Sequence, residues 1–310
     1  MTADPPPPPL LRRDLVAGGW SDDELARARR AGSLERLRRG AYLDQPLPED
    51  AATRHRLLVH ATVAGLRREA VVSHQSAAVL HGLSTWGAGL GRVHVTRRPP
   101  ASSDASRTLR CHVADLAADE VTEVAGLPVT DLARTVLDLA RSLPLEAAVV
   151  VLDDALARRL VDPVGLAARL VRMTGTRGSR RAARALALAD GRSESVGESR
   201  SRVLLHRLGL APSGLQFPVR TADGVLVGRT DFVWEDHGVV GEFDGRVKYG
   251  RLLRPGQEPG DAVFQEKRRE DAVRAEGWGV VRWTWGDLSR PGTVGARVSR
   301  ALDDGRRRRA

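Results

Sequence analysis

Three carboxylates in the last third of the chain have the types and the spacing that bind a divalent cation. Glu242 and Asp244 lie two residues apart in a predicted strand, so their side chains point to the same face. Glu242 follows the apolar pair Val239 and Val240, and a carboxylate at the end of a buried run needs a compensating cation. Asp231, in the preceding predicted strand, adds a third oxygen ligand. Three carboxylates favour Mg²⁺ or Mn²⁺ as the bound ion. Either ion can activate a water molecule for attack and stabilise the charge that develops on phosphorus.

Each of these acidic residues also has a structural alternative. Glu198 is a further catalytic candidate because it lies at the edge of the buried face of a predicted helix, but with Ser195 it also forms a capping-box pattern. The Asp244-Gly245 pair is a strong turn signal. Glu242 could pair with an arginine instead of a metal ion.

Lysine is rare in this chain. Of 49 basic residues only Lys248 and Lys267 are lysines, and both lie near the acidic group. A compact ammonium differs from a planar guanidinium as a phosphate ligand, so we take Lys248, four residues after Asp244, as a catalytic candidate. The alternative is that Lys248 is solvated and that Lys267 forms an i,i+4 pair with Asp271.

The elements that must position these residues lie within residues 191–290. The pattern predicts a helix, three strands, a second helix and a final strand, an order that favours a restriction-endonuclease-like α-β-β-β-α-β domain. A C-terminal helix and basic tail follow over residues 291–310. The predicted elements are residues 195–208, 216–220, 225–234, 239–242, 264–276 and 280–284.

Residues 10–48 predict a winged helix-turn-helix. A short helix is followed by a second helix that begins with the capping box of Ser21 and Glu24, and then by a hairpin with cations at its tip. Such a module places its second helix near the major groove and its wing on phosphate or in the minor groove. The alternative is a solvated arginine-rich helix followed by a structural hairpin. The DNA-binding candidates are Arg27, Arg29, Arg30, Arg38 and Arg39.

Residues 51–190 predict a mixed α/β middle domain, with helices over residues 71–83, 131–142 and 145–160 and strands over residues 92–96 and 110–113. His74 and His81 are seven residues apart on the first of these helices. Without an accompanying cysteine or carboxylate cluster, we interpret them as core or capping histidines and not as metal ligands.

Composition favours a DNA-directed protein of the cytoplasm. The net charge of +10 suits a polyanionic partner, although an arginine-rich codon bias would also produce it. No apolar run approaches the roughly 18 residues that cross a bilayer, so no membrane partner is expected. The proline-rich residues 1–9 predict a disordered tail in place of a signal peptide, and a single cysteine, Cys111, excludes an internal disulfide.

Two family resemblances rest on local motifs. Residues 191–288 resemble the very-short-patch-repair-type endonucleases of the PD-(D/E)XK superfamily, through Glu198, Asp231-Phe232, residues 241–245, Asp271 and residues 277–283. This resemblance implies a Mg²⁺-dependent nuclease fold. The superfamily pattern has a lysine two residues after Glu242, where this chain has Asp244.

The N-terminal half resembles the AbiEi-type antitoxin family, through residues 14–42, 73–78 and 126–135. That family joins a winged helix to a second domain and represses its own operon, which implies a toxin or other protein partner. The leading hypothesis is therefore a DNA-binding, metal-dependent endonuclease. The alternative is a non-enzymatic antitoxin-like repressor with a degenerate nuclease fold. A sugar hydrolase with paired carboxylates fits the basic charge poorly.

Overall fold

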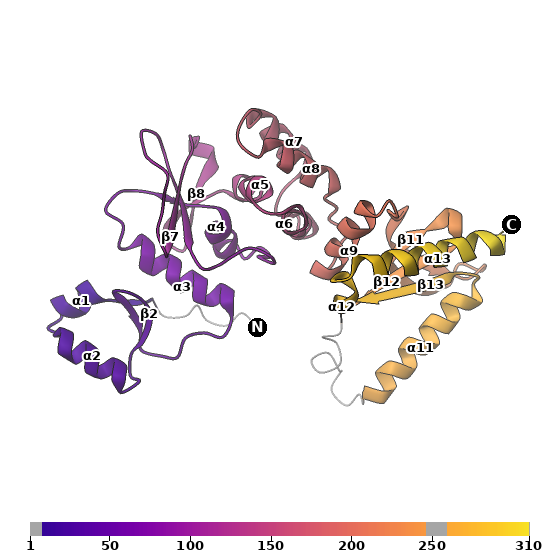
Figure 1. Cartoon of the computed structure of the whole chain (residues 1–310), viewed down its shortest axis with the longest axis horizontal. Helices are drawn as coiled ribbons and strands as arrows, with labels where there is room; N and C mark the ends of the chain where they lie inside the picture. The colour runs from indigo at the N-terminus through magenta and orange to yellow at the C-terminus, as the bar shows by residue number, and fades with distance from the viewer. Residues whose placement is uncertain (1–7, 246–258, 310) are drawn as a thin grey trace. The chain divides into compact units, whose positions relative to one another are not determined.

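The chain folds as a mixed α+β protein with more than one compact unit. The computed structural model describes residues 8–245 and 259–309. The first unit comprises Met1–Val151 and Leu160–Arg184, and the second comprises Leu152–Arg159 and Ala185–Ala310. Three sheets occur among the described residues (Figure 1). In the same residues no helix has both the length and the apolar character that a membrane crossing requires.

The N-terminal part of the first unit combines two helices with a small sheet of order β1-β3-β2. The predicted capping box is confirmed, since the Glu24 amide donates to Ser21 Oγ at 3.3 Å and the Ser21 amide donates to the Glu24 carboxylate at 2.7 Å. Gly40 turns the antiparallel β2–β3 hairpin with a φ of 78°. The elements are β1 (Leu10–Leu11), α1 (Arg12–Ala17), α2 (Asp22–Arg30), β2 (Glu35–Arg38) and β3 (Ala41–Leu43).

A six-stranded mixed sheet of order β6-β7-β5-β4-β9-β8 forms the rest of the first unit's core. Its strands are β4 (Val71–Val72), β5 (Val93–Arg97), β6 (Asp104–Ala105), β7 (Leu109–Val113), β8 (Val121–Val124) and β9 (Leu127–Thr130). The helices that follow the first hairpin are α3 (Ala51–Val63), α4 (His74–Leu80), α5 (Leu132–Ser142), α6 (Leu145–Ala157), α7 (Pro163–Arg172) and α8 (Ser179–Leu188).

The prediction of one helix over residues 71–83 is wrong at its start. Val71 and Val72 form β4, which pairs antiparallel with β5 and parallel with β9. Valine is β-branched and favours a strand, and the helix begins only at His74. This short strand brings the first residues of α4 beside β5, which matters for the histidines described below.

The second unit has the predicted order of elements. Strands β10 and β11 pair antiparallel, as do β11 and β12, whereas β12 and β13 are parallel and are connected through α11. Parallel strands need such a crossover. The elements are α9 (Val196–Arg207), β10 (Gly214–Arg220), β11 (Leu226–Trp234), β12 (Val239–Asp244), α11 (Pro259–Ala275), β13 (Gly279–Thr284), α12 (Trp285–Leu288) and α13 (Pro291–Arg309).

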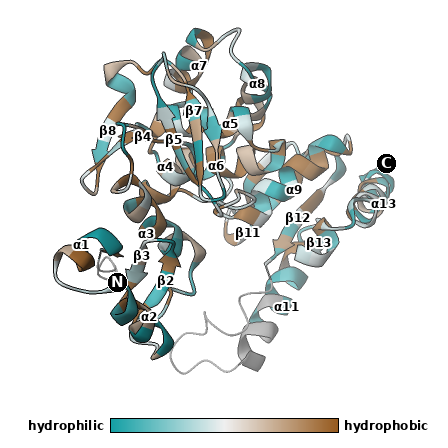
Figure 2. Cartoon of the chain, turned by 60° about the vertical axis from the view of Figure 1, so that its left-hand side comes forward, coloured by the Kyte–Doolittle hydropathy of each residue, from teal (hydrophilic) through white to brown (hydrophobic). Residues whose placement is uncertain are grey.

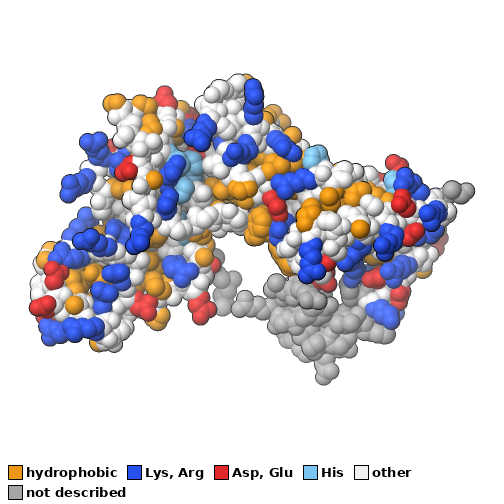
Figure 3. All heavy atoms as spheres, viewed as in Figure 1, with side chains coloured by type: hydrophobic (Ala, Val, Ile, Leu, Met, Phe, Trp, Pro, Cys, Tyr) orange, Lys and Arg blue, Asp and Glu red, His pale blue; other side chains and the backbone are white. Residues whose placement is uncertain are grey.

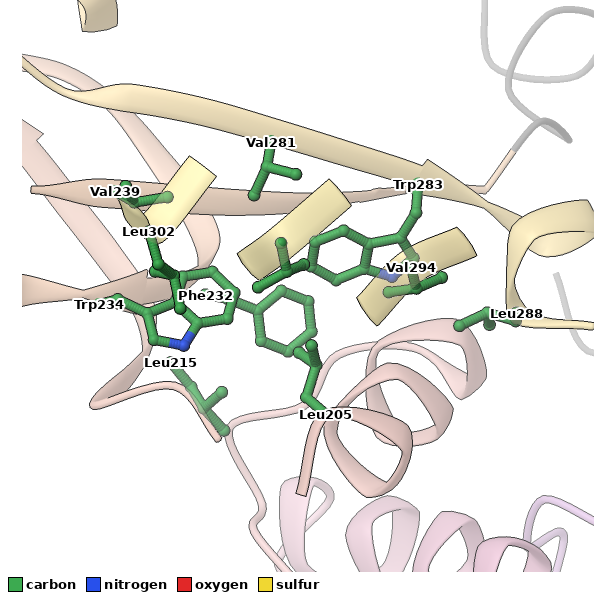
Figure 4. Close-up of a cluster of buried hydrophobic side chains, with 11 residues drawn as sticks. Leu205, Leu215, Phe232, Trp234, Val239, Val281, Trp283, Leu288, Val294 and Leu302 are labelled. Atoms are coloured by element: carbon green, nitrogen blue, oxygen red, sulfur yellow. The ribbon is translucent and has the colours of Figure 1, made fainter. Parts of the chain in front are cut away.

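Both faces of this sheet are covered. On one face, Figure 4 shows Phe232 beside Leu205 of α9 and Trp234 beside Leu215, in a cluster that also contains Val294 and Leu302 of α13. Helix α13 is thus part of this core, although the sequence placed it in a separate segment. On the other face, Val219, Val233 and Val240 pack against Val273 of α11. Since residues alternate between faces, Asp231 within β11 and the pair Glu242 and Asp244 near the end of β12 are set toward one side of the sheet by their register.

Candidate functional site

Asp231 lies where strands β11 and β12 stop pairing. The last paired residues are Phe232 and Gly241, so Asp231 is the next residue along β11. Its carboxylate reaches across to β12 and accepts a hydrogen bond from the Phe243 amide at 2.8 Å. Asp231 lies inside β11 and not at its end, and this hydrogen bond holds it beside the segment that carries Glu242 and Asp244.

Glu242 is balanced by two guanidinium groups. It is 9% exposed, and its carboxylate contacts Arg269 of α11 at 2.7 Å and Arg282 of β13 at 2.6 Å. The parallel register sets Glu242 directly beside Arg282, which also contacts Glu270 at 3.1 Å. An arginine partner, the alternative that the sequence left open, is thus present for this buried carboxylate. Arg269 and Arg282 were not singled out from the sequence.

Glu198 connects helix α9 to strand β10. Its carboxylate accepts hydrogen bonds from Ser195 Oγ at 2.7 Å, the Glu194 amide at 2.9 Å and Gln216 Nε2 at 2.8 Å. The Glu198 amide donates in turn to Ser195 Oγ at 3.2 Å. With 8% exposure and these donors, Glu198 has the helix-capping role of the structural alternative, and its catalytic role stays a prediction.

The acidic residues do not form a tight ligand cluster. Among the side chains that the structure describes, no three carboxylates have oxygen atoms that all lie within 4.8 Å of one another. Asp244 is partly exposed at the end of β12, beside Thr284 of β13. Lys248 lies outside the described residues, and Lys267 is exposed on α11. A metal ion at Glu242 would have to compete with the two guanidinium groups that contact its carboxylate.

The predicted DNA-binding arginines differ in their contacts. Arg27, Arg29 and Arg30 are exposed in the last turn of α2, which is mostly hydrophilic in Figure 2, and Arg39 is exposed at the hairpin tip. Figure 3 shows basic side chains on the surface of this N-terminal region, and the sequence makes all of them arginines. Arg38 instead points back into the fold, where its guanidinium donates to the Ala61 and Arg39 carbonyls and burial lowers its pKa.

Three histidines of the first unit lie together. The ligand nitrogens of His74 in α4, His94 in β5 and His112 in β7 are all within 4.8 Å of one another, so these residues could hold a metal ion. The sequence interpretation considered His74 only with His81. His81 Nε2 contacts the Thr130 carbonyl at 2.8 Å, which gives it the structural role that we predicted.

All three imidazoles are neutral near pH 7. Burial, reinforced by neighbouring histidine and arginine charges, lowers the pKa of His94 to about 3 and that of His112 to about 3. The same causes hold the pKa of His74 well below its usual range. The neutral form is the one that offers a nitrogen lone pair to a metal. The sequence signal was present but weak, because His94 and His112 each stand between apolar residues in a predicted strand.

Comparison with known proteins gives relatives without an assigned activity. No family model matches this chain. Two curated proteins of Mycobacterium tuberculosis, from two strains and both named as uncharacterized, are 30% identical to it over 184 residues. The match covers 59% of this chain and 65% of each relative, so the chain spans less than two thirds of their length.

Proposed function

We propose that this protein binds DNA through residues 10–48 and hydrolyses DNA phosphodiester bonds with a Mg²⁺ or Mn²⁺ ion at the acidic residues of the second unit. The observation that carries the proposal is the position of Asp231, whose carboxylate is held against β12 beside Glu242 and Asp244. This arrangement occurs in a domain with the predicted α-β-β-β-α-β order of elements. The resemblance to very-short-patch-repair-type nucleases of the PD-(D/E)XK superfamily supports the same function.

Phosphodiester hydrolysis needs a metal ion with oxygen ligands and positively charged side chains that bind the phosphate. Asp231 and Glu242, with Asp244 near them, are the residues that would hold the ion. Bound there, Mg²⁺ would lower the pKa of an attacking water and stabilise the charge that develops on phosphorus.

Arg269 and Arg282 are suited to bind the phosphate. A guanidinium binds phosphate oxygens as readily as carboxylate oxygens, through paired N–H donors. Both arginines are about one-third exposed, at 30% and 29%, so a phosphate can reach them. In the structure described here they neutralise Glu242. We propose that an arriving phosphate takes over at least one guanidinium and frees an oxygen of Glu242 for the metal.

DNA affinity would come from the N-terminal region. Arg27, Arg29, Arg30 and Arg39 are exposed and carry charge on one helix and one hairpin, the two elements that a winged helix places on DNA. Phosphate contacts by such residues supply affinity that does not depend on sequence. Arg38 is engaged with the Ala61 carbonyl, so we assign it to folding.

The test separates binding from cleavage by measuring both on one labelled duplex. Asp231→Asn keeps the size of the side chain and removes its charge, so we expect cleavage to fall by at least about 100-fold with little change in DNA affinity. The matched control is Asp223→Asn, in the exposed turn before β11, which should cleave like the wild type. Equal cleavage by Asp231→Asn and the wild type would reject the proposed site.

A non-enzymatic repressor is the second candidate. Two observations favour it: Asp244 stands where the superfamily has a lysine, and Glu242 is already paired with two arginines. In this case the chain would act like an AbiEi-type antitoxin, with DNA upstream of its own gene and a cognate toxin as partners. Tight binding of that DNA by a wild type that cleaves no substrate in any metal would favour this candidate.

A further inference from the structure

We propose that His74, His94 and His112 form a binding site for a transition-metal ion of the zinc class. Three of the eight histidines in the chain converge here from separate elements, at sequence separations of 20 and 18 residues. The site belongs to the first unit and is independent of the proposed nuclease function. It uses nitrogen ligands, whereas the acidic residues of the second unit offer oxygen.

The backbone holds the three residues in place. His94 is fixed by two hydrogen bonds, from its amide to Ser76 Oγ at 2.8 Å and from the Ser73 amide to its carbonyl at 3.0 Å. His112 lies on β7, which pairs with β5 in parallel and sets His112 beside Thr96. The strands therefore fix two ligands, and the start of α4 supplies the third.

His74 adopts a backbone conformation that a non-glycine residue rarely takes. Its φ is 53°, in the left-handed region, where the Cβ atom crowds the backbone. Residues held in this region cluster at binding and catalytic sites. Here the conformation turns the chain from β4 into α4 and brings the His74 ring against His112, with ring centroids 3.7 Å apart.

The distance between two of the ring nitrogens is close to the distance that they would have as ligands of one ion. His94 Nδ1 and His112 Nε2 form a hydrogen bond of 3.0 Å. Nitrogens at about 2.1 Å from a tetrahedral ion lie roughly 3.4 Å from one another. The His74 and His112 rings are nearly parallel, with planes 11° apart, so a rotation of one ring is needed to aim both lone pairs at one ion.

The groups around the rings support ligation. His74 Nδ1 lies 3.1 Å from Ser73 Oγ, which also accepts a hydrogen bond from Thr96 Oγ1 at 2.8 Å. A metal-bound histidine commonly donates its other ring N–H to such an oxygen, which leaves His74 Nε2 for the ion.

The donor set selects the class of metal. Imidazole nitrogens suit Zn²⁺, Cu²⁺, Ni²⁺ and Fe²⁺, whereas Mg²⁺ and Ca²⁺ require oxygen. Three histidines leave a fourth position for water or an anion, as in zinc sites that take part in chemistry. His94 and His112 are partly exposed, and Figure 3 shows histidine side chains reaching the surface of the first unit among basic side chains. Arg110 and Arg141 contribute positive charge nearby, so an anionic fourth ligand is favoured.

The test is a Co²⁺ titration of the full chain after removal of metals with a chelator. We expect one equivalent of Co²⁺ to bind with the intense visible absorption of a four-coordinate site, and Zn²⁺ to displace it. His94→Gln and His112→Gln should each weaken binding by more than about tenfold. His60→Gln, at a partly exposed histidine of α3 outside the cluster, should leave the spectrum unchanged.

A second measurement guards against variants that fail to fold. In the wild-type protein, one equivalent of Zn²⁺ should shift the ring ¹⁵N resonances of three histidines and leave the other five unchanged. Unshifted histidine resonances, or a folded His112→Gln protein that binds Co²⁺ as tightly as the wild type, would overturn the proposal.

Discussion

Substitution of Glu242 by glutamine tests how strongly the two arginines stabilise this carboxylate. The change keeps the side-chain shape but removes the charge that Arg269 and Arg282 contact at 2.7 and 2.6 Å. A hydrogen bond to a charged group contributes about 1.5–3 kcal/mol, and a glutamine oxygen can still accept one neutral bond. Both arginines are partly exposed, which screens the interaction. We therefore expect a loss of about 2 kcal/mol in the free energy of unfolding, or roughly 6 °C in Tm for a unit of this size.

Glu194→Gln is the matched control. Glu194 contacts Arg229 at 2.6 Å, the same distance as in the Glu242–Arg282 pair, but both side chains are 53% exposed. Exposed pairs contribute little, so the expected loss is below about 0.5 kcal/mol, within roughly 2 °C in Tm. The comparison keeps residue type, substitution and shortest distance constant, and it changes burial together with the number of arginine partners, which is two for Glu242 and one for Glu194.

Thermal unfolding followed by tryptophan fluorescence in EDTA makes this measurement. Four of the six tryptophans, Trp234, Trp278, Trp283 and Trp285, belong to the second unit, and Trp283 is fully buried. The signal therefore reports mainly on the unit that contains Glu242, without a contribution from bound metal. Equal Tm shifts for the two variants would refute the reasoning, because burial would then not strengthen the Glu242 contacts.

Three further substitutions have clear expected outcomes. Gly197→Ala would drive a Cβ atom into the Phe243 ring, so we expect a loss of about 1–3 kcal/mol by chemical denaturation. Arg39→Gln should reduce the slope of the logarithm of the DNA-binding constant against the logarithm of salt concentration by roughly 0.9 per lost phosphate contact. Arg38→Gln should instead lower Tm. The opposite pattern would contradict our assignment of the two arginines. A hydrogen bond from the Thr284 amide holds the pKa of Asp287 below its usual range, so its stabilising contribution is present at neutral pH and is lost as pH falls through the folded-state pKa. Asp287→Asn should therefore lower Tm at pH 7, and the two proteins should converge as the pH falls through the folded-state pKa of Asp287. A difference in Tm that stays constant as the pH falls would exclude that linkage.

Local interactions were predictable from the sequence. Ser21 and Glu24 are three residues apart, and a capping box needs no other part of the chain, so the spacing alone was sufficient. The order of elements in residues 191–290 was predictable for the same reason, because hydrophobic periodicity identifies each helix and strand separately. The β-branched pair Val71-Val72 was missed because two residues are too few to show a strand period.

Contacts between distant segments were not predictable. The histidine cluster depends on the parallel register of β5 and β7. The register of two strands that are separated along the chain cannot be inferred from a single sequence. The same limit applies to charged residues. The residue types alone show that Arg38 and Glu242 are charged. Only the fold shows their partners, which are the Ala61 carbonyl for Arg38 and two arginines for Glu242.

The proposed function requires the second unit to hydrolyse DNA with a divalent ion, and this requirement can be measured as DNA cleavage by the wild-type protein. Plasmid, linear duplex and single-stranded DNA would be incubated with the purified chain in Mg²⁺, in Mn²⁺ and in excess EDTA. Our account predicts nicked or cut DNA with either ion and none with EDTA, since the acidic residues supply oxygen ligands. Equal cleavage in EDTA, or DNA that stays intact in both metals, would contradict it.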